Sequence, residues 1–284
     1  LEEKATVVES KRAALLSLQA EHEEAKNRIL ETQGQLEALR NHLATESRKL
    51  DAKKNEHDLL KSLVDNMEGY PESVKFLHRN GGWNHTAPLL SDVIYVKEEY
   101  RTALENVLEP FLGYYVVNNL EEGMQAVRLL DGAKKGKASF FLLDAVQEQQ
   151  ALPPGPDGVI PALDVIEVDE QYRKLAEQLL CNVYVAESES ALSLNGDSVV
   201  LDKTGRYVRG KYTLRGGSVG LFEGKKIGRA KNLEKLRSEV SDLEKIVQEY
   251  QSRIQRTQNE LLGYNSRLKE REIREAEREI QGLN

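Results

Sequence analysis

Apolar residues near the start of the chain follow a seven-residue repeat. In residues 1–68 one apolar series recurs every seven positions and a second follows three residues behind it: Val8, Leu15, Ile29, Leu36, Leu43, Leu50 and Val64, then Leu18, Ala25, Leu39 and Leu60. Polar residues such as His22 and His57 fall on the same seam. This repeat predicts a long helix that buries a narrow seam in a coiled coil.

The end of the chain carries the same pattern. In residues 232–284 the two series are Leu233, Val240, Val247, Ile254, Leu261 and Leu268, and Leu236, Leu243, Tyr250 and Tyr264. The phase then shifts, and the seam continues as Ile273, Ala276, Ile280 and Leu283. We interpret this shift as a stutter in a helical arm. Since two such arms flank one insert, we expect an antiparallel pair within the chain; helices that pair with other chains are the alternative.

Between the arms lies a segment with a different composition and an internal repeat. Residues 69–225 hold all seven prolines and the only tryptophan, so we expect a folded domain there. Within it, Asp92–Arg101 aligns with Asp164–Arg173 at an offset of 72 residues. Each copy predicts a strand and then an amphipathic helix, at Val93–Val96 and Glu98–Leu108, and again at Val165–Val168 and Glu170–Leu180.

Further elements complete the two halves. We expect strands at Tyr114–Val117, Ala138–Leu143, Val183–Val185, Ser198–Leu201, Tyr207-Val208 and Tyr212–Leu214, and short helices at Leu120–Leu130 and Ser188–Leu194. The predicted fold class is α+β, with two tandem related mixed α/β subdomains forming a hinge, flanked by a long antiparallel coiled coil. The predicted domains are an N-terminal arm (1–68), a first subdomain (69–151), a proline-rich linker (152–158), a second subdomain (159–225) and a C-terminal arm (226–284).

Composition excludes several classes of protein. Charged residues make up 31% and aromatic residues 6% of the chain, which is typical of long helices with a smaller folded part. No apolar run approaches the roughly 20 residues of a membrane span, and no secretory leader is visible. The single Cys181 cannot form an internal disulfide, which favours a reducing cytosol. Because the first residue is Leu1, we expect a piece of a longer protein.

The sequence shows no catalytic constellation. Gly132–Ala138 resembles a phosphate loop, but three residues rather than four separate its glycines, and Ala138 replaces the Ser or Thr that binds Mg²⁺. A basic turn is therefore favoured. His78 and His85 lack metal-ligand spacing, Cys181 is expected to be a buried thiol, and the sequon Asn84–Thr86 is irrelevant in a cytosolic chain. We expect no enzyme activity, cofactor or metal in this segment.

Positive charge is concentrated late in an otherwise acidic segment. Residues 69–225 carry 16 Lys and Arg against 22 Asp and Glu, yet between residues 203 and 226 seven basic residues face Glu223 alone. Tyr207 and Tyr212 lie among them and are suited to stack on bases. Weak, sequence-independent DNA contact is favoured, and an edge strand protected by its charge is the alternative. The DNA-contact candidates are Lys203, Arg206, Arg209, Lys211, Arg215, Lys225 and Lys226, with Lys134, Lys135 and Lys137 from the first half.

A glycine-rich stretch follows the last predicted strand. Residues 216–220 include three glycines. A backbone without side chains allows another backbone to approach closely. A flexible turn and an edge-to-edge contact between subunits are both compatible with this composition.

These motifs together resemble the hinge of SMC proteins (structural maintenance of chromosomes) with its adjoining coiled coils. The resemblance is carried by Gly69–Pro71, Leu90–Val96, Lys137–Asp144, the second copy of the repeat, Leu214–Ser218 and Ile227–Arg229. It implies a toroidal homodimer in which the first subdomain of one copy contacts the second subdomain of the other. The interface residues that it implies are Gly210, Gly216, Gly217 and Ser218, while Arg215 stands where the family often has Thr.

The resemblance also implies a role in chromosome condensation and segregation. The segment would be a non-enzymatic hinge that joins two arms into a V or ring and contacts DNA weakly, in the cytoplasm and associated with the nucleoid. The family's ATP-binding head, and kleisin-type and loader subunits, would lie outside this segment, and a bacterial homodimer is favoured over a eukaryotic heterodimer. The main alternative is a tethering or cytoskeletal coiled-coil protein with an inserted protein-binding domain. A zinc-hook arm lacks its CxxC motif, and an α/β enzyme lacks catalytic groups.

Overall fold

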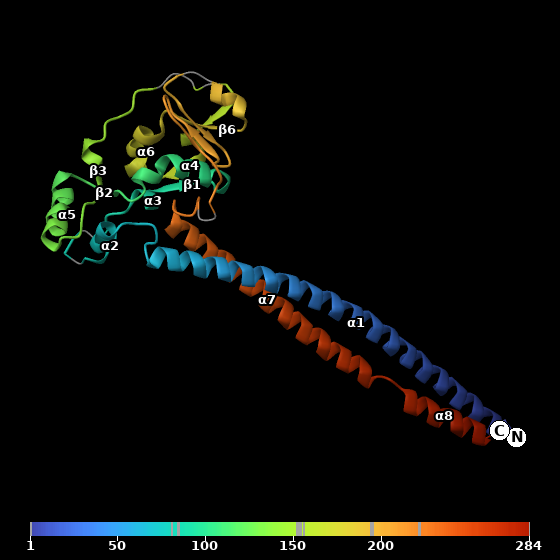
Figure 1. Cartoon of the computed structure of the whole chain (residues 1–284). Coiled ribbons are helices and arrows are strands. Elements are labelled where there is room, and N and C mark those ends of the chain that lie inside the picture. The colour runs from blue at the N-terminus through green and yellow to red at the C-terminus, as the bar shows by residue number, and fades with distance from the viewer. Residues whose placement is uncertain are drawn as a thin grey trace. The chain divides into compact units, whose positions relative to one another are not determined.

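The chain forms two units, a helical one and one that mixes helices and strands (Figure 1). The computed structural model describes residues 2–80, 82–83, 86–151, 155, 157–193, 196–220 and 223–283. One unit, which we call the arm, consists of residues 1–56 and 236–284. The other, which we call the hub, consists of residues 57–235.

The arm is an antiparallel helical pair. Its helices belong to α1 (Glu2–Asp65), α7 (Arg229–Ser266) and α8 (Glu270–Leu283). Lys11 Nζ lies 2.6 Å from Glu279 Oε2, whereas Lys53 Nζ lies 3.1 Å from Glu239 Oε2, so positions early in α1 meet positions late in the chain. The most buried positions of α1 in the arm lie on the predicted seam and include Ala25, Thr32, Leu36, Leu39 and Leu50. Pairing within the chain is confirmed.

The shift of seam phase after Leu268 is a break between two helices. α7 ends at Ser266 and α8 begins at Glu270. The backbone N–H of Lys269 donates to His22 Nδ1 across the pair, at 3.0 Å. In a continuous helix, the five-residue step from Leu268 to Ile273 would place Ile273 about 140° away from the seam. The break between α7 and α8 restores the contact of the seam with α1. The interpretation as a simple stutter was therefore wrong.

The hub contains the two repeated halves. The first half consists of α2 (Glu72–Arg79), α3 (Leu90–Val93), β1 (Ile94–Val96), α4 (Arg101–Leu108), β2 (Tyr115–Val117), α5 (Leu120–Ala133) and β3 (Phe140–Leu142). The second consists of β4 (Val159–Pro161), β5 (Ile166–Val168), α6 (Arg173–Leu180), β6 (Val183–Ala186), β7 (Val199–Asp202), β8 (Tyr207–Arg209) and β9 (Leu214–Gly216). Short 3-10 turns lie between them at Glu98–Tyr100, Glu109–Phe111, Leu143–Ala145, Ala162–Val165, Glu170–Tyr172 and Glu189–Ser193.

The structural repeat follows the sequence repeat. β1, α4 and β2 recur as β5, α6 and β6, and the strands β1 and β5 pair with each other in antiparallel fashion. β2 pairs with β3 in parallel, and β6 pairs with β7 in parallel. The second half adds strands to reach a five-stranded sheet in the order β4-β6-β7-β8-β9. The prediction of two related mixed subdomains is confirmed.

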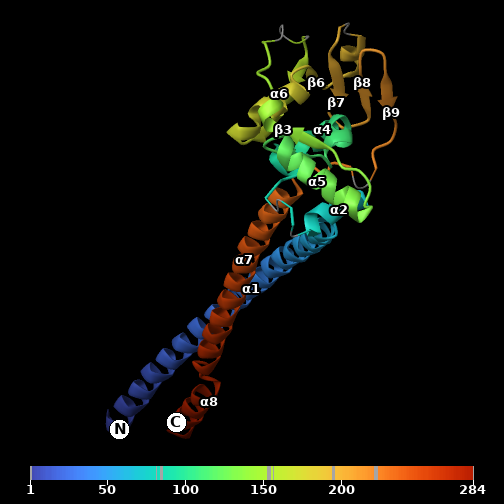
Figure 2. The same ribbon diagram turned by 90° about the vertical axis from the view of Figure 1, so that its left-hand side faces the viewer.

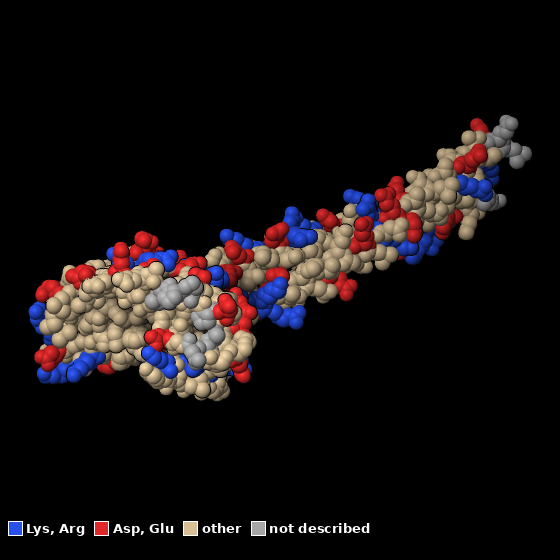
Figure 3. Space-filling model, turned by 90° about the horizontal axis from the view of Figure 1, so that it is seen from above, with Lys and Arg blue, Asp and Glu red and all other residues tan. Residues whose placement is uncertain are grey.

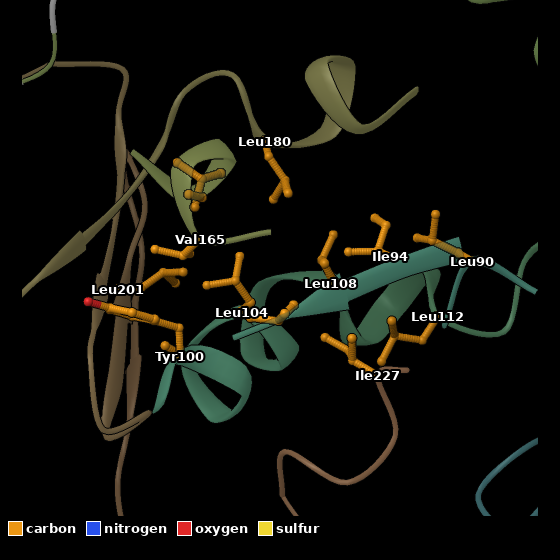
Figure 4. Packing of buried hydrophobic residues seen from close by; sticks show 14 of the residues in the cluster. Leu90, Ile94, Tyr100, Leu104, Leu108, Leu112, Val165, Leu180, Leu201 and Ile227 are labelled. Atoms are coloured by element: carbon orange, nitrogen blue, oxygen red, sulfur yellow. The ribbon is translucent and has the colours of Figure 1, made fainter. Parts of the chain in front are cut away.

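Both halves share one hydrophobic core. Leu104 and Leu108 of α4 point toward Val165, Leu180 and Leu201 of the second half (Figure 4). Ile227, which follows the second half, is fully buried in the same cluster. A smaller cluster around Trp83 and Tyr115 fills the space between α2, α5 and the β2–β3 pair. The halves therefore fold as one body.

Some local expectations differ from the structure. The last strand is Leu214–Gly216 rather than Tyr212–Leu214, because the Gly210 N–H donates to the Thr213 carbonyl and closes a turn over those residues. A helix was expected at Ser188–Leu194; its described residues form only a 3-10 turn over Glu189–Ser193, and Leu194 lies outside the described residues. The sequence interpretation missed α2 and β4. Most of the predicted linker 152–158, and His85 with Asn84 of the sequon, lie outside the described residues.

Candidate dimerisation edge and nucleic-acid surface

Strand β9 forms an open edge of the five-stranded sheet. It pairs with β8 on one side, and no described strand pairs with its other side (Figure 2). All three of its residues are exposed, and Leu214 is 70% exposed. An exposed edge presents unpaired backbone N–H and C=O groups, which makes it a template for strand addition.

The four predicted interface residues lie at this edge, and two glycines already have a role within the chain. A Cβ atom at position 216 would lie 2.9 Å from the Arg206 carbonyl oxygen of the neighbouring strand. A Cβ at Gly210 would lie 2.6 Å from Thr213 Oγ1. Gly217 has φ of +154° with open space around it, and Ser218 is exposed. Gly217 and Ser218 are thus the positions most open to a second molecule.

Much of the predicted basic strip is paired within the hub. Lys203 contacts Glu99 and Glu187, Lys211 contacts Asp197, and Arg215 contacts Glu109. Arg206 donates to the buried carboxylate of Asp202 at 3.0 Å. Burial raises the pKa of Asp202, but hydrogen bonds from Arg206 and Thr204 outweigh burial and lower it overall. The strip therefore presents less free charge than its sequence suggests.

Three further residues of the strip differ in how firmly contacts within the hub hold their side chains. The Arg209 guanidinium donates to the Leu192 carbonyl. Lys226 is half-buried, donates to the Gly69 carbonyl at 3.0 Å and lies 4.5 Å above the Tyr70 ring, and burial lowers the pKa of its ammonium. Lys225 is exposed and has no side-chain partner among the described residues.

The first-half lysines form a separate exposed turn. Lys134 ends α5 in the left-handed conformation, with φ of +54°, and among the described residues it pairs only with the exposed Asp131. Lys135 lies 5.9 Å from the Phe76 ring of α2, so the turn lies beside that helix. In the described part of the hub, neither Lys135 nor Lys137 has a carboxylate partner. α2 itself carries Lys75 and Arg79, which the sequence analysis missed because it did not expect this helix.

Charge is mixed over the visible surface. Basic and acidic side chains alternate along the arm in Figure 3, and both signs appear on the hub face shown there. Exposed ion pairs contribute about 0–1 kcal/mol each, so a phosphate can replace the carboxylate partner at little cost. The lysine turn (Lys134, Lys135 and Lys137) and Lys225 are the candidates with the freest charge.

Glu105 of α4 anchors the chain where it leaves the second half. Its Oε2 accepts the backbone N–H of Lys226 at 3.0 Å and that of Ile227 at 3.3 Å. Burial raises the pKa of this carboxyl, and the backbone hydrogen bonds only partly oppose that shift. Neighbouring Asn106 donates to the Gly205 carbonyl at 2.7 Å. Sequence reasoning missed this role, because only the fold brings α4 to that segment.

Among the described residues there is neither a membrane-spanning helix nor a cluster of metal ligands. None of their helices is long and apolar enough to cross a membrane. No group of three or more His, Cys, Asp or Glu among them is placed to hold a metal ion. Cys181 is a free thiol that is half-buried, whereas the sequence analysis expected it to be buried.

A duplicated α/β hub inserted between two antiparallel helices, with an open edge strand, defines a hinge-type module. Residues 84–195 match the family model "SMC proteins Flexible Hinge Domain". Residues 84–195 therefore form an SMC hinge domain, as the sequence resemblance indicated.

Individual relatives agree with that assignment. The chain is 25% identical over 280 residues to chromosome partition protein Smc of Chlorobaculum tepidum, a match that covers 97% of this chain and 21% of that protein. It is 36% identical over 93 residues to chromosome partition protein Smc of Methanocaldococcus jannaschii, covering 32% of this chain and 8% of that protein. The chain thus spans only a small part of these relatives.

A solved structure has the same fold. The crystal structure of an asymmetric dimer of the Geobacillus stearothermophilus SMC hinge domain superposes with a TM-score of 0.63 at 20% identity. The match covers 82% of this chain and 99% of that chain.

Proposed function

We propose that this chain is the dimerisation hinge of an SMC protein that acts in chromosome condensation and segregation, and that two copies join their coiled-coil arms into a V or ring. The observation that carries the proposal is the exposed, unpaired edge of β9, with Gly217 and Ser218 beside it, in a hinge-domain fold. The relatives named chromosome partition protein Smc and the dimeric Geobacillus hinge support it.

Two of the open strand edges of the hub, those of β3 and β9, lie in different halves and suit such a contact. In the described residues β3 pairs only with β2, just as β9 pairs only with β8. If the first half of one copy meets the second half of the other, the two-fold axis repeats the contact and both edges of both copies are used. The interface would then include Gly210, Gly216, Gly217 and Ser218 in each copy.

Sedimentation measurements test the dimer. The full chain, and a fragment that covers residues 57–235, should both sediment as dimers at micromolar concentration. The fragment must extend past residue 225, since Ile227 belongs to the core. A hub that remains monomeric at high concentration would refute the proposal.

We also propose weak, sequence-independent contact with DNA. The lysine turn and Lys225 supply free cations, and Lys203, Lys211 and Arg215 can exchange their exposed carboxylate partners for phosphates. Arg206 and Arg209 contribute mainly through their positive charge, because Arg206 binds the buried Asp202 carboxylate and Arg209 binds the Leu192 carbonyl. Lys226 contributes less, because its ammonium is half-buried. Such binding weakens steeply as salt concentration rises, since each phosphate contact releases counterions.

A salt titration separates the two groups of cations. Lys134, Lys135 and Lys137 are changed together to Gln in one variant, and Lys203, Arg206, Arg209 and Lys211 in another. We expect the first variant to lose more affinity for a short duplex and to show the shallower salt dependence. Equal binding by both variants and the unchanged chain would refute DNA contact at these residues.

The remaining activities of such a protein belong outside this segment. We propose that the hub and arms carry no catalysis of their own, and that ATP hydrolysis and kleisin-type or loader subunits involve other parts of the protein. A cytoplasmic, nucleoid-associated location is consistent with that role.

A further inference from the structure

A recess in the hub lies between the end of α1, helix α2 and the beginning of α7. Its volume is about 250 Å³, which is room for roughly eight waters at about 30 Å³ each. The side chains of Val64, Met67, Leu89 and Ala230 give it apolar walls. None of the residues proposed above for dimerisation or DNA contact lines it, so the recess is a separate feature of the hub.

Asp92 lines this recess, and no cation among the described residues forms an ion pair with its carboxylate. Its Oδ2 accepts the backbone N–H of Leu89 at 3.4 Å, which leaves Oδ1 without a donor from those residues. Asp92 is exposed, yet burial raises the pKa of its carboxyl by more than the Leu89 N–H, His78 and Arg229 lower it. A carboxyl that is exposed and yet surrounded by protein lies within the recess rather than on an open surface.

The polar neighbours of Asp92 in the recess do not supply that donor. The guanidinium of Arg229 donates to two backbone carbonyls, at 2.9 Å and 2.8 Å, and forms no ion pair with Asp92. The hydroxyls of Tyr70 and Tyr115 are each hydrogen-bonded to other residues. His78 also lines the recess and makes no ion pair within the described part of the hub. The recess therefore holds one carboxyl oxygen that lacks a partner, among walls that are mostly apolar or aromatic.

We propose that this recess binds a small organic cation, whose primary ammonium group pairs with Asp92 and whose alkyl part packs against Val64, Met67 and Leu89. A charge-assisted hydrogen bond from the ammonium supplies the donor that Oδ1 lacks. The apolar walls lower the local dielectric constant and strengthen the attraction between the two charges. An anion is disfavoured, because the carboxylate repels it and Arg229 is already held by backbone carbonyls. A bound cation contacts both the end of α1 and the first turn of α7.

The two methionines of the chain provide a test by NMR. Met67 lines the recess, whereas Met124 is 36% exposed on α5 and serves as the internal control. The full chain, labelled with ¹³C at the methionine methyl groups, is titrated with 1-butylamine, and in parallel with butan-1-ol and with butyrate, in a buffer without amines. We expect butylammonium to shift the Met67 signal and leave that of Met124 in place. Butan-1-ol and butyrate should bind at least about tenfold more weakly, since neither offers Asp92 a charged donor.

A matched pair of variants assigns the charge. Asp92→Asn keeps an acceptor for the Leu89 N–H but removes the negative charge, and we expect it to weaken butylammonium binding at least about tenfold. Asp164→Asn changes the exposed counterpart of Asp92 in the second copy of the repeat and should leave that binding unchanged. Melting temperatures check that both variants are folded. The proposal is overturned if the Met67 signal does not move in the unchanged chain, if butan-1-ol or butyrate binds as tightly as butylammonium, or if a folded Asp92→Asn variant keeps the full affinity.

Discussion

Tyr95 of β1 pairs directly with Glu167 of β5, and Glu167 is also the residue that aligns with Tyr95 in the sequence repeat. The neighbouring pairs, Ile94 with Val168 and Val96 with Ile166, are symmetric about this point. The two halves are therefore related by a local pseudo-two-fold axis through the ladder. Lys231 of α7 contacts both residues of this central pair: its Nζ lies 4.2 Å from the centre of the Tyr95 ring and 2.9 Å from Glu167 Oε2.

Gly216 and Ser218 should respond differently to substitution. Gly216→Ala places a methyl group against the Arg206 carbonyl, so we expect a loss of about 1–3 kcal/mol in the free energy of unfolding. Ser218→Glu lies in exposed backbone and should leave that free energy unchanged while it weakens dimerisation. Urea unfolding and light scattering on both variants check this. Equal stability losses would show that Ser218 has an unrecognised role within the chain.

Removal of the Glu105 carboxylate should destabilise the segment at Lys226 and Ile227, whose backbone N–H groups it accepts. Glu105→Ala leaves the N–H groups of Lys226 and Ile227 without their acceptor in a partly buried place. We expect a loss of about 2–3 kcal/mol in the free energy of unfolding. Glu98→Ala, at an exposed position of the preceding turn, is the control for chemical denaturation. A loss no larger than that of the control would contradict the anchoring role.

The raised pKa of Glu105 gives a signed pH dependence. Burial raises this pKa above the ordinary 4.5, so above that value the folded state holds a proton that the unfolded state has lost. The contribution of Glu105 to stability therefore falls as pH rises through the window from 4.5 to the folded pKa. We expect unfolding free energies of Glu105→Gln to lack this decline relative to the unchanged chain. An equal decline of the unfolding free energy with pH in both proteins would contradict this role of Glu105.

His22 should hold the beginning of α8. Its Nδ1 accepts the N–H of Lys269 at the break between α7 and α8. His22→Ala removes the acceptor, and a lost hydrogen bond of about 0.5–1.5 kcal/mol corresponds to roughly two- to tenfold faster hydrogen exchange near residues 269–273. His57→Ala, on the same seam, serves as the control. Unchanged exchange in His22→Ala would show that the break forms without this contact.

Periodicity and repetition made most of the fold predictable. The seam of α1 and the repeat from β1 to β6 depend on local apolar spacing, which a sequence displays directly. The break over residues 267–269 was not predicted, because seam phase alone does not distinguish a distorted helix from an interrupted one. α2 was missed because its eight residues are too few for an apolar period to repeat, although Val74 and Leu77 are buried on one face.

The candidate site was less predictable, because its properties depend on contacts between distant residues. The position of the glycines at a strand edge follows from sequence. The neutralisation of Arg206 by Asp202, Lys211 by Asp197 and Arg215 by Glu109 depends on how the strands and turns fold together. Counting charges along the chain therefore overstated the basic field.

Within the hub, the segment that follows α1 is hydrogen-bonded to the segment at the beginning of α7. Lys226 and Arg229 donate to the carbonyls of Gly69 and Glu68, at 3.0 Å and 2.8 Å, and both cations lie over the Tyr70 ring. We expect a load that pulls on α1 or α7 to pass to the other helix through these two hydrogen bonds before it reaches the sheet.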